Sequence, residues 1–295
     1  MRVFVTGASG HIGSALVPEL VQAGHEVTGL ARSQTSAAAV KALGAEVRRG
    51  DTSDLDGLRE AAASTDAVVH LAFNHDVAFI RADMAAAAAM DMATVQAFGD
   101  ALAGTGKTFI GIGLGEAAAG GPAASGNPRS AVAREIAGFA GRGIRSVLVA
   151  IPPVVHSTRD KAGFIPILIR IARAAGVSGY VGDGANRWPA VHTLDLGRLY
   201  RLALEKAPAG SQLIAAADEG VAVREIAETI GRHLDIPAVS IPADKATEHF
   251  GPFGAIMSLG LPPVSNASTR QLLDWSPEHP GLIADLNEGH YFATG

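Results

Sequence analysis

The sequence predicts an α/β protein with a doubly wound parallel sheet and a smaller C-terminal lobe. In the first half of the chain, short apolar runs alternate with segments of helical periodicity, a pattern typical of parallel strands joined by helical crossovers. After Pro152 the elements become shorter and richer in Pro, Gly and His. We therefore expect a first domain over residues 1–155, to which 176–207 return, and a lobe over 156–175 and 208–295.

The elements of the first domain follow from hydrophobic period and from Gly and Pro positions. Pro18 falls inside the first helix, where it removes one hydrogen bond and predicts a local kink. Strands are expected at 2–6, 26–31, 46–49, 67–71, 108–112 and 146–151, and helices from 12 to just before Gly24 and at 35–43, 55–62, 81–103 and 129–141. After Pro153, helices are expected at 164–175, 193–204 and 223–234, and strands at 188–192, 213–217 and 239–241.

The turn after the first strand carries glycine at every third position. Gly7 permits a tight turn, Gly10 lets the backbone approach a pyrophosphate, and Gly13 lets the helix pack on the strand. The helix N-terminus adds a partial positive charge and unpaired N–H groups. The pattern predicts a dinucleotide-binding Rossmann domain. The expected phosphate-binding residues are Gly7, Ser9, Gly10, His11, Ile12 and Gly13.

The second strand ends in Ala31-Arg32-Ser33, without an acid. A carboxylate at this position accepts the ribose hydroxyls of NAD and repels a 2′-phosphate. A guanidinium and a hydroxyl suit a phosphate monoester instead. Arg32 and Ser33 therefore predict NADP(H) as the cofactor.

Composition excludes several functional classes. The net charge of −5 and the lack of a Lys/Arg cluster argue against nucleic-acid binding. The absence of cysteine excludes disulfides and thiolate zinc sites, and the His, Asp and Glu residues show no spacing typical of a metal site. No signal-peptide pattern and no apolar run of about 18 residues is present. We expect a cytoplasmic protein with a small-molecule substrate, without metal, membrane or nucleic acid.

These segments, taken in order, resemble the extended and atypical short-chain dehydrogenase/reductases, including NAD(P)-dependent epimerase/dehydratase-like proteins, over nearly the whole chain. The glycine turn, the segment Gly50–Asp54, the strand end His70–Phe73 and the loop Ile151–His156 each fit a family motif. The resemblance implies that further residues border the cofactor: Asp51 and Thr52 at the adenine, Leu71, Ala72 and Phe73 beneath it, and Pro152 and Val155 at the nicotinamide. It also implies a homodimer through helices 81–103 and 129–141, whose small residues allow close approach.

The catalytic positions depart from the family pattern. Typical members carry Tyr and Lys four residues apart, and the Lys lowers the pKa of the Tyr that exchanges a proton with the substrate. The matching positions here are Ser130 and Arg134. The family's Ser or Thr after the fifth strand is also missing from Gly111–Gly115, and an Asn of the central helix is replaced by Asp91.

Four residues are therefore candidates for chemistry. Asp91 donates a proton if burial raises its pKa, and His75 is a candidate general acid near neutral pH. Arg134 is a candidate for the lysine's contact with the ribose hydroxyls, and Ser130 for holding a water or a polar substrate atom. A surface or structural role is the alternative for each.

Other sources of the proton are Tyr180, which would need a lowered pKa, and water. His156, at the expected rim of the cleft, either contributes there or simply packs. His192 and Asp195 are expected to be structural residues at a helix start.

The leading interpretation is an NADP(H)-dependent oxidoreductase that moves hydride to or from a small, fairly apolar C=O or C=N group. Asp91 favours C=N, because a carboxylate attracts an iminium. One alternative is a catalytically silent NADP(H)-binding redox sensor, which the missing Tyr/Lys pair favours. Another is a sugar-nucleotide epimerase or dehydratase.

Overall fold

The computed structural model describes residues 1–81, 83–113, 127–258 and 264–293, and the chain forms two compact units. The family's Ser or Thr is missing from Gly111–Gly115, and the last two of these residues, Leu114 and Gly115, lie outside the described residues. The first unit is Met1–Ile151, Leu196–Ile214 and Ser268–Trp275, and the second is Pro152–Asp195, Ala215–Ala267 and Ser276–Gly295.

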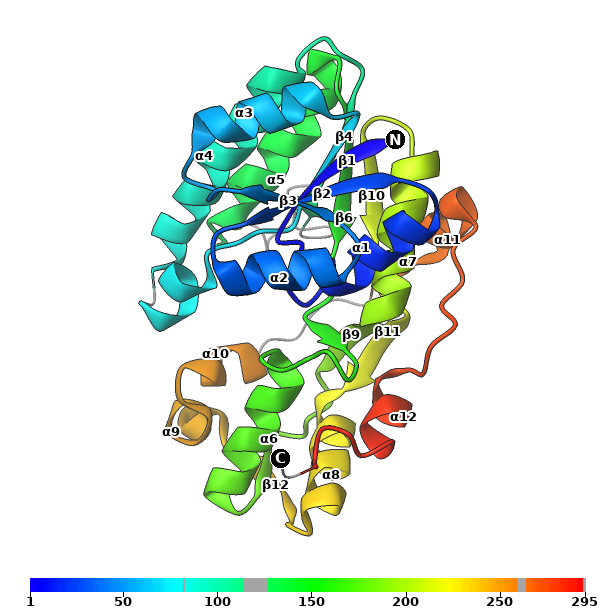
Figure 1. The fold of residues 1–295 in the computed structure, drawn as a ribbon. Helices are drawn as coiled ribbons and strands as arrows, with labels where there is room; N and C mark the ends of the chain where they lie inside the picture. The colour runs from blue at the N-terminus through cyan, green and yellow to red at the C-terminus, as the bar shows by residue number, and fades with distance from the viewer. Residues whose placement is uncertain (82, 114–126, 259–263, 294–295) are drawn as a thin grey trace. The chain divides into compact units, whose positions relative to one another are not determined.

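The first unit is built on a seven-stranded parallel sheet with the order β10-β6-β5-β4-β1-β2-β3 (Figure 1). The predicted doubly wound fold is confirmed. β1 lies between β2 and β4, so the strand order reverses beside it, and ligands of such sheets bind beyond the strand ends at this switch point. The strands are β1 (Arg2–Thr6), β2 (Glu26–Ala31), β3 (Glu46–Arg49), β4 (Ala67–His70), β5 (Thr108–Gly113), β6 (Arg145–Ala150) and β10 (Ser211–Ile214).

Three helices, α3 (Leu55–Ser64), α4 (Met84–Leu102) and α5 (Arg129–Gly138), lie side by side in one layer (Figure 1). Aromatic rings fill the space between this layer and the sheet. The ring of Phe98 lies 6.3 Å from that of Phe4 and 5.8 Å from that of Phe109, centroid to centroid. This apolar core fixes α4 and α5 against the ends of the central strands.

The other helices of this unit include α1 (Gly13–Gln22), which contains Pro18 as expected, and α2 (Gln34–Ala42). α7 (Thr193–Lys206) belongs to the unit from Leu196 onward, and α11 (Ala267–Leu273) from Ser268. No helix in the described part of the chain is both long and apolar enough to cross a membrane.

The predicted helix boundaries shift where side chains cap the backbone. The pattern predicts a helix from 81, but α4 begins at Met84, because the Asp83 carboxylate accepts a hydrogen bond from the N–H of Ala86 at 2.8 Å. Residues Asp76–Ile80 before it form a single π-helical turn, a feature frequent at functional sites.

The second unit contains a three-stranded sheet, β11-β9-β7, and a parallel pair, β12-β8. The sequence predicts that residues 176–207 return to the first domain. In the structure the returning segment begins at Leu196. The reason is that β9 ends at His192 and pairs with β7 and β11 inside the second unit. The strands are β7 (Val154–His156), β8 (Ser178–Val181), β9 (Arg187–His192), β11 (Asp218–Ala222) and β12 (Ala238–Ile241).

The helices of the second unit surround a separate apolar core. Trp188 of β9 is fully buried there and contacts the ring of Phe164 at 5.6 Å. The helices are α6 (Phe164–Ala175), α8 (Val223–Leu234), α9 (Ala246–Phe250), α10 (Gly254–Met257) and α12 (Leu282–Asn287).

Gly13 and Gly10 provide a test of the turn between β1 and α1. A Cβ atom on Gly13 would lie 2.2 Å from the carbonyl oxygen of Gly7, a backbone atom, whereas one on Gly10 would meet only that oxygen, at 3.2 Å. We expect Gly13→Ala to lower the free energy of unfolding by at least about 1–3 kcal/mol, the range for overpacking. Gly10→Ala should change it by no more than about 0.5 kcal/mol. Urea unfolding of both variants checks this, and equal losses would contradict it.

Candidate functional site

Backbone contacts shape the glycine turn between β1 and α1, the predicted phosphate site. Gly7 has φ +70°, and a Cβ there would lie 2.9 Å from the backbone of Leu71 and Ala72, so the protein itself requires glycine. A Cβ atom on Gly10 would meet only one atom, the carbonyl oxygen of Gly7 at 3.2 Å, and otherwise open space. A glycine that packing does not demand fits a turn that a phosphate group approaches closely.

Helix α1 differs from its neighbours at its N-terminus. No side chain caps it, and its first turn contains no acid. By contrast, α2, α3 and α4 are capped by Ser33, Asp54 and Asp83. The uncapped N-terminus retains its partial positive charge for an anionic ligand. The predicted residues Ser9, His11 and Ile12 lie in this turn, before the first residue of α1.

The C-terminal ends of β2 and β3 present two guanidinium groups, those of Arg32 and Arg49. The side chain of Arg32 is 69% exposed, and its guanidinium lies 3.9 Å from the carboxylate of Asp76. Arg49 donates a hydrogen bond to the carbonyl oxygen of Ser33. The hydroxyl of Ser33 caps α2 by accepting the N–H of Ser36 at 3.1 Å, so at this edge the cationic groups are Arg32 and Arg49.

The other predicted cofactor residues fall into three groups. Asp51 and Thr52 lie in the turn before α3, where an Asp51 oxygen accepts the N–H of Ser53 at 3.0 Å. Leu71, Ala72 and Phe73 follow β4 directly. Pro152 and Val155 lie in the second unit: Pro152 precedes β7 and Val155 belongs to it. Their place beside the nicotinamide stays a prediction.

A buried chain of polar side chains begins where β1 and β4 end. The register pairs Thr6 with His70, and the hydroxyl of Thr6 hydrogen-bonds Nδ1 of His70 at 2.6 Å. Nε2 of His70 donates to Oδ1 of Asp91 on α4 at 2.9 Å. The other oxygen of Asp91 lies 3.9 Å from the guanidinium of Arg129, the first residue of α5. Thr6, His70 and Asp91 are buried and Arg129 is partly buried, so this chain of side chains links the end of β1 to α4 and α5.

Arg129 lies beside a small cavity that is also lined by His70, Ala72 and Asp91. Its guanidinium stacks over the ring of Phe73, 4.2 Å from the centroid. Burial lowers the pKa of Arg129, and the Asp91 carboxylate opposes that shift. Since arginine keeps its proton in proteins, the cavity carries a fixed cation whose charge Asp91 balances.

A tyrosine of the same unit stands near this cation. Tyr200 is fully buried, and its hydroxyl has no hydrogen-bond partner in the described residues. Burial raises the pKa of Tyr200 far above its ordinary value, and the charge of Arg129 opposes this only in part. Tyr200 is therefore a neutral phenol at any physiological pH.

The structure brings some predicted catalytic residues together and separates others. Asp91 lines the cavity, whereas Arg134 is exposed on a different face of α5, beside Glu135 and Arg142. Ser130 is buried on α5. His75 lies five residues after the end of β4, and the centroid of its ring is 5.4 Å from that of Phe73.

Thr6, His70 and Arg129 are not among the sequence candidates. Thr6 and His70 end two neighbouring strands, which is the signal that marks them, because side chains at the C-terminal edge of a parallel sheet converge. For Arg129 the signal is helical phase, since it shares a face with Val132 and Ile136, which also line the cavity.

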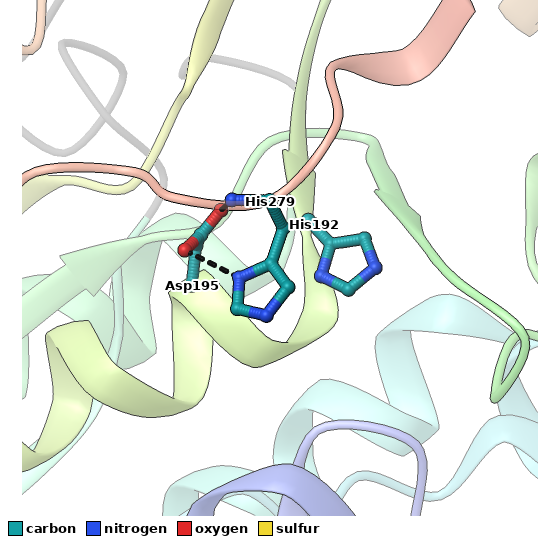
Figure 2. Close-up of side chains that lie close together, drawn as sticks. All are labelled: His192, Asp195 and His279. Carbon is teal, nitrogen blue, oxygen red and sulfur yellow. Dashed lines mark hydrogen bonds and ion pairs between the residues drawn. The ribbon is translucent and has the colours of Figure 1, made fainter. Parts of the chain in front are cut away.

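The remaining candidates belong to the second unit. Tyr180 lies on β8, and the guanidinium of Arg224 stands over its ring, with Cζ 5.6 Å from the ring centroid. His156 is fully buried, and its Nδ1 donates to Asp285 at 2.8 Å. Figure 2 shows His192 and Asp195 beside a third residue, His279. Burial, then the nearby His156 and His279, lower the pKa of His192 to about 4.

The titration of His75 tests the placement of Arg129. Partial desolvation and the positive charge of Arg129 lower the pKa of His75 below its ordinary 6.5. Because a nearby cation disfavours the imidazolium, Arg129→Gln should raise the pKa of His75, whereas Arg134→Gln should leave it unchanged. NMR titration of the His75 ring in wild type and both variants provides the measurement. An equal pKa in the three proteins would place Arg129 away from His75.

The parallel sheet, the switch point and the uncapped glycine turn define the first unit as a Rossmann domain of the dinucleotide-binding class. The model of the NAD dependent epimerase/dehydratase family matches residues 3–110. The uncharacterized protein C2A9.02 of Schizosaccharomyces pombe is 40% identical over 99% of this chain and 100% of its own length. The chain belongs to this family, within the extended short-chain dehydrogenase/reductases, and the resemblance seen in the sequence is confirmed.

More distant relatives extend the comparison. The UDP-glucose 4-epimerase of Streptomyces lividans is 28% identical, over 98% of this chain and 96% of its own. Among solved structures, DesIV, a dTDP-glucose 4,6-dehydratase from Streptomyces venezuelae with NAD and TYD bound, superimposes with a TM-score of 0.75 at 20% identity, covering 97% of this chain and 96% of its own. The UDP-glucuronic acid 4-epimerase of Bacillus cereus, with UDP-glucuronic acid and NAD, gives a TM-score of 0.72 at 18% identity, covering 99% and 98%. These solved structures share the fold.

Proposed function

We propose that this protein is an NADP(H)-dependent oxidoreductase that interconverts a small, fairly apolar carbonyl compound and its alcohol. The observation that carries the proposal is the guanidinium of Arg129, which lines the cavity at the C-terminal ends of the central strands and is held by Asp91. In this proposal Arg129 replaces the family's Tyr/Lys pair as the group that binds the substrate oxygen.

A nicotinamide dinucleotide fits the first unit. The family and the NAD-containing structures of DesIV and the glucuronic acid epimerase support this class of cofactor. The glycine turn and the uncapped end of α1 would hold the pyrophosphate. Arg32 and Arg49 would bind a 2′-phosphate, which favours NADP(H). When bound, the dinucleotide supplies the hydride donor or acceptor.

The chain's own residues then have separate tasks. Arg129 donates hydrogen bonds to the carbonyl oxygen, where negative charge develops during reduction. Asp91 holds the guanidinium in place, and His70 and Thr6 hold Asp91. Phe73 shields one face of the guanidinium from water. The proton that the oxygen gains comes from His75 or from water.

The charges at the cavity favour C=O over C=N substrates. The carboxylate of Asp91 is already paired with His70 and Arg129, so it is not free to stabilise an iminium. A protonated imine would also meet the positive guanidinium, whereas the oxyanion formed from a carbonyl is attracted to it.

Turnover distinguishes this proposal from the two alternatives. A panel of aldehydes, ketones and cyclic imines is incubated with NADPH, and cofactor oxidation is followed at the NADPH absorption band. The proposal expects oxidation with carbonyl substrates. A redox sensor would bind NADPH without consuming it, and an epimerase would convert a sugar nucleotide without net oxidation.

Cofactor choice is tested at Arg32. We expect wild type to bind NADPH more tightly than NADH, and Arg32→Ala to weaken NADPH binding by roughly 10- to 150-fold, which corresponds to the roughly 1.5–3 kcal/mol of hydrogen bonds to a charged group. NADH binding should change little. Arg59→Ala, which removes another exposed arginine paired within α3, is the control. Isothermal titration gives the dissociation constants, and equal affinities of wild type for the two cofactors would refute the NADP assignment.

The role of Arg129 is tested against its neighbour on the same helix. Removing a donor to a developing oxyanion costs roughly 10²- to 10³-fold in kcat, so Arg129→Gln should lose that much carbonyl reductase activity while NADPH affinity is retained. Arg134→Gln, on the exposed face, should stay within about twofold of wild type. Steady-state kinetics on the best carbonyl substrate provide the comparison. The reverse ranking would assign the lysine's role to Arg134.

A further inference from the structure

Three side chains of the second unit come together although their sequence spacing predicts no site. His192 ends β9, Asp195 lies in the first turn of α7, and His279 follows 84 residues later, shortly before α12 (Figure 2). One nitrogen of each histidine and one oxygen of Asp195 lie within 4.8 Å of one another. Two imidazoles and a carboxylate at this separation are a donor set suited to a metal ion.

Asp195 already fixes the segment that carries His279. Its two oxygens accept hydrogen bonds from the backbone N–H of Glu278 at 2.9 Å and from that of His279 at 3.1 Å. The oxygen bound to Glu278 also accepts a hydrogen bond from Nδ1 of the His279 ring at 2.8 Å. The backbone of the segment is thus held independently of the ring. This leaves the His279 ring, which is 37% exposed, as the adjustable member of the cluster.

A fourth residue supplies an independent observation. His156 is fully buried, and Asp285 orients its ring through Nδ1. Its Nε2 has no hydrogen-bond partner in the described residues. The His156 ring stands edge-on to that of His192, with centroids 5.5 Å apart and planes at 78°. A carboxylate on one ring nitrogen and an unused second nitrogen are the arrangement of a metal-ligating histidine, and a buried polar atom without a partner is otherwise unfavourable.

We propose that His192, Asp195 and His279 bind a divalent transition-metal ion of zinc-like preference, with Nε2 of His156 as the fourth donor. Imidazole nitrogens with a single carboxylate favour Zn²⁺, Co²⁺ or Ni²⁺, whereas Mg²⁺ and Ca²⁺ prefer oxygen ligands throughout. Four protein donors make a closed site, which is structural rather than catalytic. The proposal is independent of the oxidoreductase function.

Binding requires one side chain to move. The rings of His192 and His279 are stacked 4.5 Å apart with their planes at 6°, so their in-plane lone pairs run parallel and do not meet at one ion. If the His279 ring turns about its Cβ–Cγ bond, its nitrogen faces the cluster and its hydrogen bond to Oδ1 of Asp195 is released. That oxygen would bind the metal with one lone pair while it keeps the N–H of Glu278 on the other. The two backbone hydrogen bonds to Asp195 keep the segment in place meanwhile.

The site would join three parts of the second unit: the end of β9, the start of α7 and the segment before α12. A ligand that binds only the folded state raises stability by mass action. Zn²⁺ should therefore raise the unfolding temperature of the intact chain, and a chelator should reverse the rise.

Cobalt spectroscopy provides the test, on full-length protein without a histidine tag. We expect Co²⁺ to give the strong visible ligand-field bands of a four-coordinate nitrogen and oxygen site, and Zn²⁺ to displace it. His279→Asn should weaken binding by at least roughly 100-fold, beyond the roughly 10- to 100-fold that loss of a supporting partner costs. His156→Gln should shift the bands as one nitrogen donor is lost.

His233→Asn is the matched control, because His233 stacks on Phe292 elsewhere in the second unit. It should bind Co²⁺ as wild type does. The proposal is overturned if wild type gives no such bands, if His279→Asn binds as tightly as wild type, or if His233→Asn weakens binding equally, which would mark adventitious binding by surface histidines. Unchanged bands in His156→Gln would remove His156 from the ligand set. Since His279 is partly exposed, its variant should fold even if one of His192 does not.

Discussion

The first unit depends on one buried interaction, the hydrogen bond between His70 and Asp91. A carboxylate that is only 8% exposed is strongly unfavourable without partners, so α4 can occupy its place only if His70 and Arg129 are there to meet Asp91. His70 in turn is held by Thr6, and that pair exists because the register of β1 and β4 places their last residues side by side. Strand register, helix position and the cation of the cavity are therefore fixed together.

The apolar surroundings strengthen this chain. The ring of His70 contacts Phe98 at 5.6 Å and Phe109 at 6.3 Å, and these rings belong to the core beneath α4 and α5. Electrostatic interactions are stronger where water is excluded. The same core that stabilises the sheet thus gives the Asp91–Arg129 pair its influence, although their closest atoms are 3.9 Å apart.

The sequence predicts the first unit well because its signals are local. Hydrophobic period and the positions of Gly and Pro locate β1 to β6, and the glycine spacing locates the turn between β1 and α1. The second unit is harder, because β7 and β8 have only three and four residues and gain their pairing from distant partners. Motif spacing makes Arg134 the candidate for the lysine's contact with the ribose hydroxyls, whereas helical phase turns Arg129 toward the cavity. The His279–Asp195 contact spans 84 residues, and no local pattern signals it.

Replacing a Tyr/Lys pair by arginine changes the chemistry that the cavity can perform. A tyrosine beside a lysine both polarises the substrate oxygen and passes it a proton. A guanidinium can stabilise an oxyanion but does not release its proton at physiological pH, and Tyr200, whose pKa burial raises, does not release one either. The two tasks must therefore be divided between residues. In the proposed mechanism, charge stabilisation falls to Arg129, and proton transfer falls to His75 or to water. His75 is a candidate because its ring lies against Phe73, the residue over which Arg129 stacks, although burial and the charge of Arg129 lower its pKa.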